Sequence, residues 1–350
     1  MESSVKIKRI FAAGMFLAIS VPWLWGCGKQ QSAEPIKVHV GVACYNQSDT
    51  FISELLACFR EEVNELGAAA TIRDGAGSQR VQNDQVKELI DAGCNVLCVN
   101  LVDRADPSEI IDLARENDIP IIFFNREPVA EDLKQWDKLY YVGADAKQSG
   151  VMQGELAADR IKSNSQADRN KDGKIQYVVL EGEPGHQDAI IRTENAVNTL
   201  RSNGIEMEKL SYGIANWNRA QAQNRMQQII GKYQNQIELV LANNDDMALG
   251  AIDAYEKLNF TENALPIFFG IDGTDDGLKA IVDSKLAGTV YNDKEGQAEA
   301  MARLAVTIVQ EGTEGQAGEE KYIYLPYEKV TSENVRNFMA PKKSESNTGS

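Results

Sequence analysis

The sequence predicts an α/β fold made of two doubly wound parallel-sheet domains. Short apolar runs such as VHVGVAC, NVLCVNLV and IPIIFFN alternate with longer helix-like segments along nearly the whole chain. Runs that are apolar throughout are typical of parallel strands covered by helices on both faces. The pattern from NVLCVNLVD through a helix to IPIIFFN recurs as IELVLANND through a helix to LPIFFGID, which indicates two similar halves. The 350 residues suffice for two such cores.

The expected elements follow from this alternation. The strands are expected at 38–44, 70–74, 95–102, 119–125, 139–145, 175–182, 209–215, 237–244, 265–272, 286–292 and 322–327. The helices are expected between them, at 52–66, 81–93, 108–118, 150–162, 196–204, 220–233, 248–259 and 277–285.

Charge excludes some classes of partner. The chain has 36 basic and 52 acidic residues, which gives a formal net charge of −16. Such a surface repels nucleic acid and anionic lipid headgroups, so neither is an expected partner, and neutral ligands remain open.

The N-terminus has the pattern of an export signal. Lys6, Lys8 and Arg9 precede an apolar stretch that is short for a membrane span and ends at Gly26-Cys27. The run LWGC resembles a bacterial lipoprotein signal, in which Cys27 becomes the lipidated N-terminus; an ordinary signal peptide is the alternative. We therefore expect a signal peptide over 1–27, a tether over 28–36, a lipid anchor in the cell membrane and an extracytoplasmic location. Residues 342–350 are expected to form a disordered tail.

The remaining cysteines are Cys44, Cys58, Cys94 and Cys98. Outside the cytoplasm they allow three disulfide pairings, and their spacing selects none. Each lies in an apolar stretch, which favours free buried thiols.

Polar residues gather at the carboxyl ends of the expected strands. They are Asp49, Asn125, Asn243, Asn244, Asp272 and Asn292. Ligands of open parallel sheets bind outside these ends, so two facing halves would form one cleft rich in amides and carboxylates. Such groups suit a ligand covered in hydroxyls, and Phe51 and Trp217 could pack on the C–H faces of a sugar ring. For any single residue, helix capping or core packing is an equally good explanation.

The stretch DRNKDGKIQ has the spacing of the first part of an EF-hand calcium loop. The backbone carbonyl of Lys174 would supply one oxygen ligand, and Gly173 would stand at the turn. The other oxygen ligands would come from the side chains of Asp168, Asn170, Asp172 and Gln176. The twelfth position, where a bidentate Glu belongs, is Val179 in an apolar run. A polar turn without an ion is the alternative.

Several motifs together resemble the type I periplasmic binding proteins, in particular their galactose- and glucose-binding branch. They are VGVACY, NDQ (83–85), NLVD (100–103), FFNREP (123–128), YYVGAD, NKDGKIQ, EGEPGHQDA (181–189), the segment around Trp217, ANND (242–245), GID (270–272) and LAGTVYND (286–293). They cover nearly the whole chain after the signal, in order.

The resemblance implies two α/β domains joined by three crossovers, with a ligand cleft between them. The N-terminal domain is expected over 37–143 plus 291–323, and the C-terminal domain over 144–290 plus 324–341. A monomer is expected. The residues implied to contact a hexose are Asp49, Phe51, Asn125, His186, Asp188, Arg192, Trp217, Asn244, Asp272 and Asn292, with Phe51 and Trp217 on either face of the ring. The carboxylate of Asp49 is implied to accept either epimer of the 4-hydroxyl, hence both D-glucose and D-galactose.

The resemblance also implies that Glu238, from a distant strand, completes the calcium loop. The bound Ca²⁺ would then be structural, since it would neutralise Asp168, Asp172 and Glu238 and hold the loop. The implied partner is the permease of an ABC transporter, and a membrane sensor or chemoreceptor is the alternative.

Two other functions are weaker. For an enzyme, the chain offers only His39 and His186, and it has no nucleophile elbow, P-loop or dinucleotide motif. The resemblance and the hydroxyl-rich surroundings expected for His186 make it a hydrogen-bond donor and not a catalytic base. Arg192 is expected to keep Asp188 and Asp272 ionised. For a sugar-responsive transcription regulator, the export signal stands where a DNA-binding domain would be. We therefore expect no catalysis and no DNA binding.

Overall fold

The computed structural model describes residues 37–312 and 321–339. The expected signal peptide with Cys27, the tether and the expected tail lie outside the described residues, and so do residues 313–320. Within the described ranges, no helix combines the length and apolar composition that a membrane span requires.

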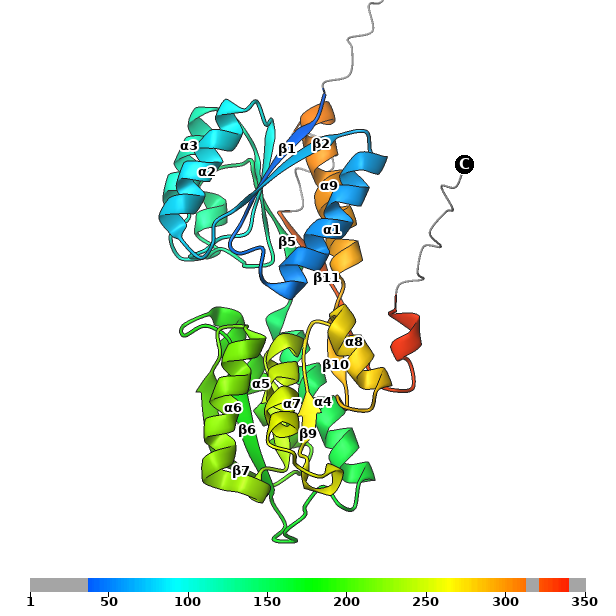
Figure 1. Cartoon of the computed structure of the whole chain (residues 1–350). Helices are drawn as coiled ribbons and strands as arrows, with labels where there is room; N and C mark the ends of the chain where they lie inside the picture. Colours follow the sequence, from blue (N-terminus) through cyan, green and yellow to red (C-terminus); the bar gives the residue numbers. More distant parts are fainter. Residues whose placement is uncertain (1–36, 313–320, 340–350) are drawn as a thin grey trace, which may run out of the picture. The chain divides into compact units, whose positions relative to one another are not determined.

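A six-stranded parallel sheet forms the centre of what we call the N-terminal lobe (Figure 1). Its strands, in spatial order, are β11 (Tyr322–Leu325), β5 (Leu139–Ala144), β4 (Ile121–Phe124), β3 (Val96–Val99), β1 (His39–Cys44) and β2 (Ala69–Asp74). Every pairing in it is parallel, and the four residues of β3 and of β4 are all buried. This confirms the predicted fold class.

Helices cover both faces of this sheet. The helices α1 (Thr50–Glu65) and α9 (Lys294–Glu311) pack together on one face, and α2 (Gln79–Asp91) and α3 (Ser108–Glu116) lie on the other (Figure 1). The buried face of α1 repeats at helical spacing through Phe51, Ile52, Leu55, Leu56, Phe59 and Val63. Helix α9 was not among the helices expected from the sequence.

A second parallel sheet forms the centre of the C-terminal lobe. Its strands, in spatial order, are β7 (Met207–Ile214), β6 (Ile175–Glu181), β8 (Leu239–Ala242) and β9 (Ile267–Phe269). One face is covered by α4 (Ala146–Ser163) and α5 (Gln187–Ser202), and the other by α6 (Arg219–Tyr233), α7 (Asp245–Lys257) and α8 (Asp275–Val282). The repeat read from the sequence corresponds to β3–α3–β4 and β8–α7–β9.

The chain passes between the lobes three times. It crosses from β5 to α4, from β10 (Thr289–Asn292) to α9, and from β11 to β12 (Tyr327–Val330). Strands β10 and β12 form an antiparallel pair, and single bridges from β10 and its preceding residue connect it with the β9 region. The domain boundaries expected at 290/291 and 323/324 fall inside β10 and β11, and each of these strands pairs within a single lobe.

Short 3-10 turns complete the described secondary structure. They are η1 (Asp132–Lys134), η2 (Gln234–Gln236), η3 (Glu262–Ala264) and η5 (Val335–Asn337).

Helices α4 and α5 pack closely because glycines face the contact. A Cβ at Gly150 would lie 2.6 Å from the carbonyl oxygen of Arg192, and one at Gly154 would lie 2.6 Å from that of Ala196. Real Cβ atoms do not approach other atoms so closely, so larger residues would force the helices apart. This contact fixes the position of α5, which carries Arg192.

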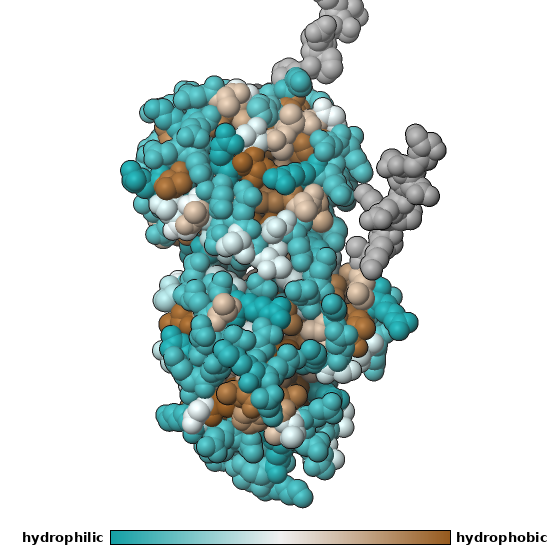
Figure 2. Space-filling view, viewed as in Figure 1, coloured by the Kyte–Doolittle hydropathy of each residue, from teal (hydrophilic) through white to brown (hydrophobic). Residues whose placement is uncertain are grey.

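One face of the molecule is mostly polar, and the thiols of the described cysteines are free. The face in Figure 2 is mostly hydrophilic, and its apolar residues lie in separate patches. The four described cysteines are unpaired, as expected; Cys44, Cys94 and Cys98 are buried, and Cys58 is half-buried. Burial raises the pKa of the Cys44 thiol to about 12, so this thiol stays protonated and unreactive at neutral pH.

Candidate ligand-binding site

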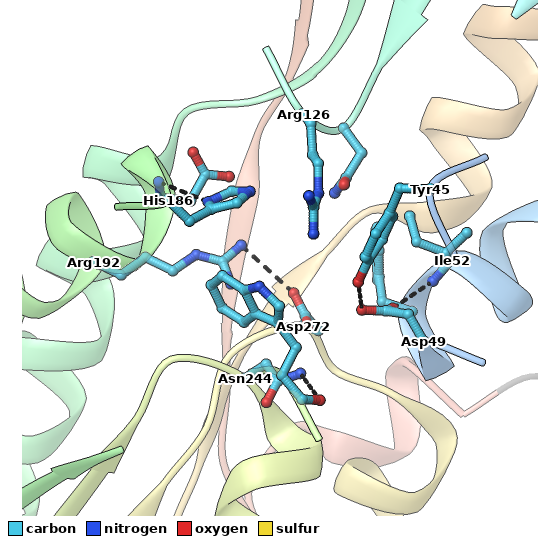
Figure 3. Close-up of a pocket in the computed structure, with 12 residues that line it drawn as sticks. Tyr45, Asp49, Ile52, Arg126, His186, Arg192, Asn244 and Asp272 are labelled. Carbon is cyan, nitrogen blue, oxygen red and sulfur yellow. Dashed lines mark hydrogen bonds and ion pairs between the residues drawn. The ribbon is translucent and has the colours of Figure 1, made fainter. Parts of the chain in front are cut away.

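A pocket lies where the carboxyl ends of strands from both lobes meet (Figure 3). It is lined by Tyr45, Asp49, Phe51, Ile52, Asn125, Arg126, His186, Asp188, Arg192, Trp217, Asn244 and Asp272. All the expected contact residues lie on it except Asn292. The side chain of Asn292 is buried beside the pocket, and its amide donates to Oδ1 of Asp272 at 3.4 Å.

Asp49 supplies a carboxylate from the N-terminal lobe. It caps α1, because its Oδ1 accepts from the backbone N–H of Ile52 at 3.0 Å. Its Oδ2 accepts from the hydroxyl of Tyr45. Burial raises the pKa of Asp49, and these hydrogen bonds oppose the shift. The carboxylate is therefore held in one orientation before any ligand enters.

Tyr45 and Arg126 line the pocket but were not singled out from the sequence, and neither was Ile52. The guanidinium carbon of Arg126 lies 3.6 Å from the centre of the Tyr45 ring. Arg126 also donates to the carbonyl of Val102 at 2.9 Å and to Oε1 of Glu183 at 2.9 Å. The sequence position of Tyr45 and Arg126 could have indicated them, since each directly follows the end of an expected strand.

Arg192 lies on the C-terminal side of the pocket and is only 4% exposed. Its guanidinium donates to the carbonyl of Asn243 at 2.7 Å and to the hydroxyl of Tyr327 at 3.1 Å. It forms an ion pair with Asp272 at 3.6 Å. Its Nε is buried without a hydrogen-bond partner within the described part of the chain. Because buried N–H groups are nearly always paired, this donor is an exception among the polar groups of the site.

Asp272 is held in an uncommon backbone conformation. Its φ is 118°, a region that favours glycine. Backbone hydrogen bonds fix it to the crossover strand, from its N–H to Val290 at 2.8 Å and from the N–H of Asn292 to its carbonyl at 3.0 Å. Burial raises the pKa of Asp272 and of Asp188, and Arg192 offsets only part of this. The pKa values of both carboxyl groups are therefore raised, whereas Arg192 alone would lower them.

Trp217 and His186 form an aromatic corner of the pocket. Their rings meet edge to face, with centres 5.3 Å apart and an angle of 79°. The backbone of Trp217 is left-handed, at φ 60°, and its carbonyl accepts from the amide of Asn244 at 3.2 Å. Asn244 in turn caps α7 through the N–H of Met247. Phe51 lines the pocket from α1, as expected, and its stacking against a ring stays a prediction.

His186 is a neutral donor in this setting. It caps α5, and its Nδ1 accepts from the backbone N–H of Asp188 at 3.2 Å. The proton of the neutral ring therefore lies on Nε2. Burial, together with the charges of Arg126, Arg192 and Arg104, lowers the pKa of His186 to about 2. The imidazole consequently offers an N–H to a ligand at any physiological pH.

Polar contacts also join the lobes away from these side chains. Thr50 donates to Asp246 at 2.7 Å across the gap between α1 and α7. The ammonium group of Lys294 lies 3.0 Å from Asp275, whose backbone N–H donates to Glu54 at 3.1 Å. These contacts join the two lobes at points outside the pocket lining.

The expected calcium loop lies against Glu238, the residue that the resemblance implies as its last ligand. Glu238 is buried, and its carboxylate accepts from the backbone N–H of Arg169 at 2.6 Å and of Gln176 at 3.1 Å. Val179 lies inside β6 and is buried. The donors proposed for Ca²⁺ are all oxygens, which suits this ion.

The loop oxygens bind groups of the chain itself. Asp168 accepts from the N–H of Gly173 at 2.9 Å, and Asp172 from that of Lys174 at 2.8 Å and from the amide of Gln176 at 2.8 Å. The side-chain amide of Asn170 also donates to Asp172, at 3.1 Å. Among residues 37–312 and 321–339, no group of three or more His, Cys, Asp and Glu is arranged to hold a metal ion. Calcium therefore stays a prediction.

Comparison with known proteins gives the family. Residues 40–314 match the periplasmic binding protein domain. The chain belongs to this family. Its members are extracytoplasmic solute-binding proteins, so the chain is not an enzyme.

Individual relatives extend this result. The D-galactose/methyl-galactoside binding periplasmic protein MglB of Haemophilus influenzae is 37% identical, over 86% of this chain and 91% of that protein. The xylitol-binding protein of Mycolicibacterium smegmatis is 29% identical, over 87% and 80%. A solved ABC transporter solute binding protein from Bacillus halodurans with bound myo-inositol superposes with a TM-score of 0.73 at 28% identity, covering 88% of this chain and 99% of that chain.

The lowered pKa of the half-buried His186 predicts a pH dependence of stability. Its pKa is lower in the folded state than the ordinary value of about 6.5, so only the unfolded chain takes up a proton as pH falls below that value. Between pH 7 and pH 5 this costs at most about 2 kcal/mol of the free energy of unfolding. We expect His186→Gln to remove this loss, which denaturant unfolding of both proteins at the two pH values would measure. An identical pH dependence in both proteins would contradict an imidazole that stays neutral in the folded state.

Glu238 gives a test of the calcium prediction. We expect Glu238→Gln to weaken calcium binding at least about tenfold and to abolish any rise of Tm on adding calcium, because one carboxylate is lost from the set. Calorimetry and thermal melting, with excess calcium or with a chelator, would measure both. The exposed Glu328→Gln serves as the control. Equal melting with calcium and with chelator, in the parent and in both variants, would rule out a structural ion.

Proposed function

We propose that this protein is an extracytoplasmic receptor that captures D-galactose, D-glucose or both in the pocket between its lobes and delivers them to an ABC importer. The observation that carries the proposal is the composition of the pocket. It combines carboxylates, amides, guanidinium groups and an imidazole N–H with the rings of Phe51 and Trp217.

These groups suit a hexose. Each sugar hydroxyl both donates and accepts, and the pocket offers acceptors at Asp49, Asp188 and Asp272 and donors at His186 and Arg192. Hydrogen bonds to ionised groups are the strong ones, and they are stronger in a site shielded from water. The buried Nε of Arg192 is a donor that the protein itself leaves unpaired within the described residues.

The choice of hexose rests on the resemblance and on the relatives. The relative with 37% identity is named for D-galactose and methyl-galactoside, whereas more distant ones are named for xylitol and ribose. Asp49 has a fixed carboxylate at the start of α1, and such a group could accept from an axial or an equatorial hydroxyl. This supports tolerance of both epimers.

Delivery would follow from closure. A ligand shifts an open–closed equilibrium only through contacts that it makes better in the closed state. A hexose in this pocket would contact residues of both lobes at once, so it would favour closure. The permease would then recognise the closed form, and ATP hydrolysis would take place in the transporter.

The first test is titration of the protein with D-galactose, D-glucose and, as a control, D-ribose. We expect saturable changes of tryptophan emission with the hexoses, because Trp217 lines the pocket. Trp217→Ala should weaken hexose binding roughly 30- to 150-fold, since it removes about 2 to 3 kcal/mol of apolar contact. Trp136→Phe, in the N-terminal lobe and outside the pocket, should leave affinity unchanged. If calorimetry shows no binding of either hexose by the parent, the ligand assignment is wrong.

The charges of the pocket predict selection for neutral sugars. Asp49, Asp188 and Asp272 outnumber Arg126 and Arg192. We therefore expect D-galacturonate to bind at least about 100-fold more weakly than D-galactose, because Arg126 and Arg192 are already paired with Glu183 and Asp272 and leave its buried carboxylate without a cation of its own.

A variant pair sharpens this test. The partner of Arg126 is Glu183, so Glu183→Gln should reduce the discrimination, whereas Glu181→Gln, outside the pocket, should not. Competition titrations against D-galactose would measure it. Equal affinity of the parent for the acid and the neutral sugar would contradict the electrostatic argument.

A further inference from the structure

Gly182, directly after β6, lies against the indole of Trp217 and is not itself part of the pocket lining. A Cβ at this position would lie 2.1 Å from Cζ2, 2.2 Å from Cε2 and 2.4 Å from Cη2 of that ring. Real Cβ atoms do not come within 3.0 Å of other heavy atoms. The ring therefore occupies the space that any side chain at position 182 would need.

The backbone of Gly182 has little freedom to withdraw. Its N–H donates to Oδ1 of Asn243 at 3.2 Å, and the side-chain amide of Asn243 donates to Thr193 at 2.9 Å. Asn243 is itself fully buried. On the other side, the carbonyl of Glu181 accepts from the N–H of Ala215 at 2.8 Å. An added methyl group would thus displace the indole and not the strand end.

The position of the indole is also fixed from its own segment. Asn216 and Trp217 are both left-handed, at φ 49° and 60°, and Asn218 caps α6 through the N–H of Gln221 at 3.0 Å. His186 meets the ring edge to face. The ring is therefore held between Gly182 and His186, and a shift away from Gly182 changes the wall of the pocket.

We propose that Gly182 is a positioning residue for ligand binding: its lack of a side chain seats the Trp217 indole in the pocket wall. The expected effect of Gly182 on ligand affinity rests on the proposed function. Its expected effect on the position of the Trp217 indole does not. Backbone conformation gives no other reason for glycine here, because the φ of Gly182 is not in the left-handed region.

The first experiment reads the ring without any ligand. In the full chain, Trp23, Trp25 and Trp136 are replaced by Phe, so that Trp217 alone emits. We expect Gly182→Ala to shift its emission to longer wavelength and to raise its quenching by acrylamide at least twofold. The control is Gly231→Ala in α6, where a Cβ would meet nothing within 4 Å, and it should change neither reading. Unchanged emission and quenching in Gly182→Ala would overturn the proposal.

The second experiment is a double-mutant cycle on hexose affinity, measured by calorimetry with D-galactose and D-glucose. We expect Gly182→Ala alone to weaken binding at least tenfold. Added to Trp217→Ala, it should change affinity less than twofold, because the ring it displaces is already absent. A tenfold loss in both backgrounds would show that Gly182 acts through another group and would overturn the proposal.

Folding is checked by circular dichroism and thermal melting. If Gly182→Ala fails to fold and Gly182→Ala/Trp217→Ala folds, the clash with the indole is confirmed. If neither folds, glycine is needed for another reason and the proposal is wrong. If the folded parent binds neither hexose, the proposed function fails, and the emission experiment still decides whether Gly182 seats the ring.

Discussion

Burial of the Arg192 guanidinium is the constraint on which the site depends. A charge removed from water is tolerated only when it is paired and hydrogen-bonded. Its partners come from the end of β8, from the turn that carries Asp272 and from β12, which are distant in sequence. The hydrogen bonds and the ion pair of this one side chain therefore fix the relative positions of these three segments beside the pocket. The glycines of α4 matter for the same reason, since they let α5 approach closely enough to place this charge.

The contacts between the lobes work on a smaller energetic scale. Each of two pairs keeps at least one partner in contact with water: Thr50 and Asp246 are both half-buried, and Lys294, itself buried, pairs with the exposed Asp275. Exposed polar pairs contribute little individually, because water replaces them at nearly equal free energy. Such contacts orient the lobes without locking them. Under the proposed function, the molecule bound in the pocket would then determine the balance between open and closed forms.

Much of this could be predicted from the sequence, because parallel strands covered on both faces are apolar throughout. Sheet topology then places polar residues at carboxyl ends in one cleft, and Asp49 and Asn125 were identified in this way. The rule does not tell which neighbours at a strand end turn inward. Arg126 lines the pocket because its side chain lies over the ring of Tyr45 and pairs with Glu183 of the other lobe. Both contacts depend on side-chain conformation. Asn292 obeys the rule but reaches the cleft only as a support for Asp272.

The three crossings have a consequence for the order in which the chain acquires its structure. Strand β11 forms an edge of the N-terminal sheet, and β12 pairs with β10 of the C-terminal lobe. Both belong to the segment 321–339, which follows all the other described residues of the two lobes in the sequence. Each lobe thus lacks a strand until this segment has emerged, and the apolar surfaces that the strand covers stay open until then. Completion of both lobes therefore depends on this one segment, and a chain cut short before residue 321 would leave both unfinished.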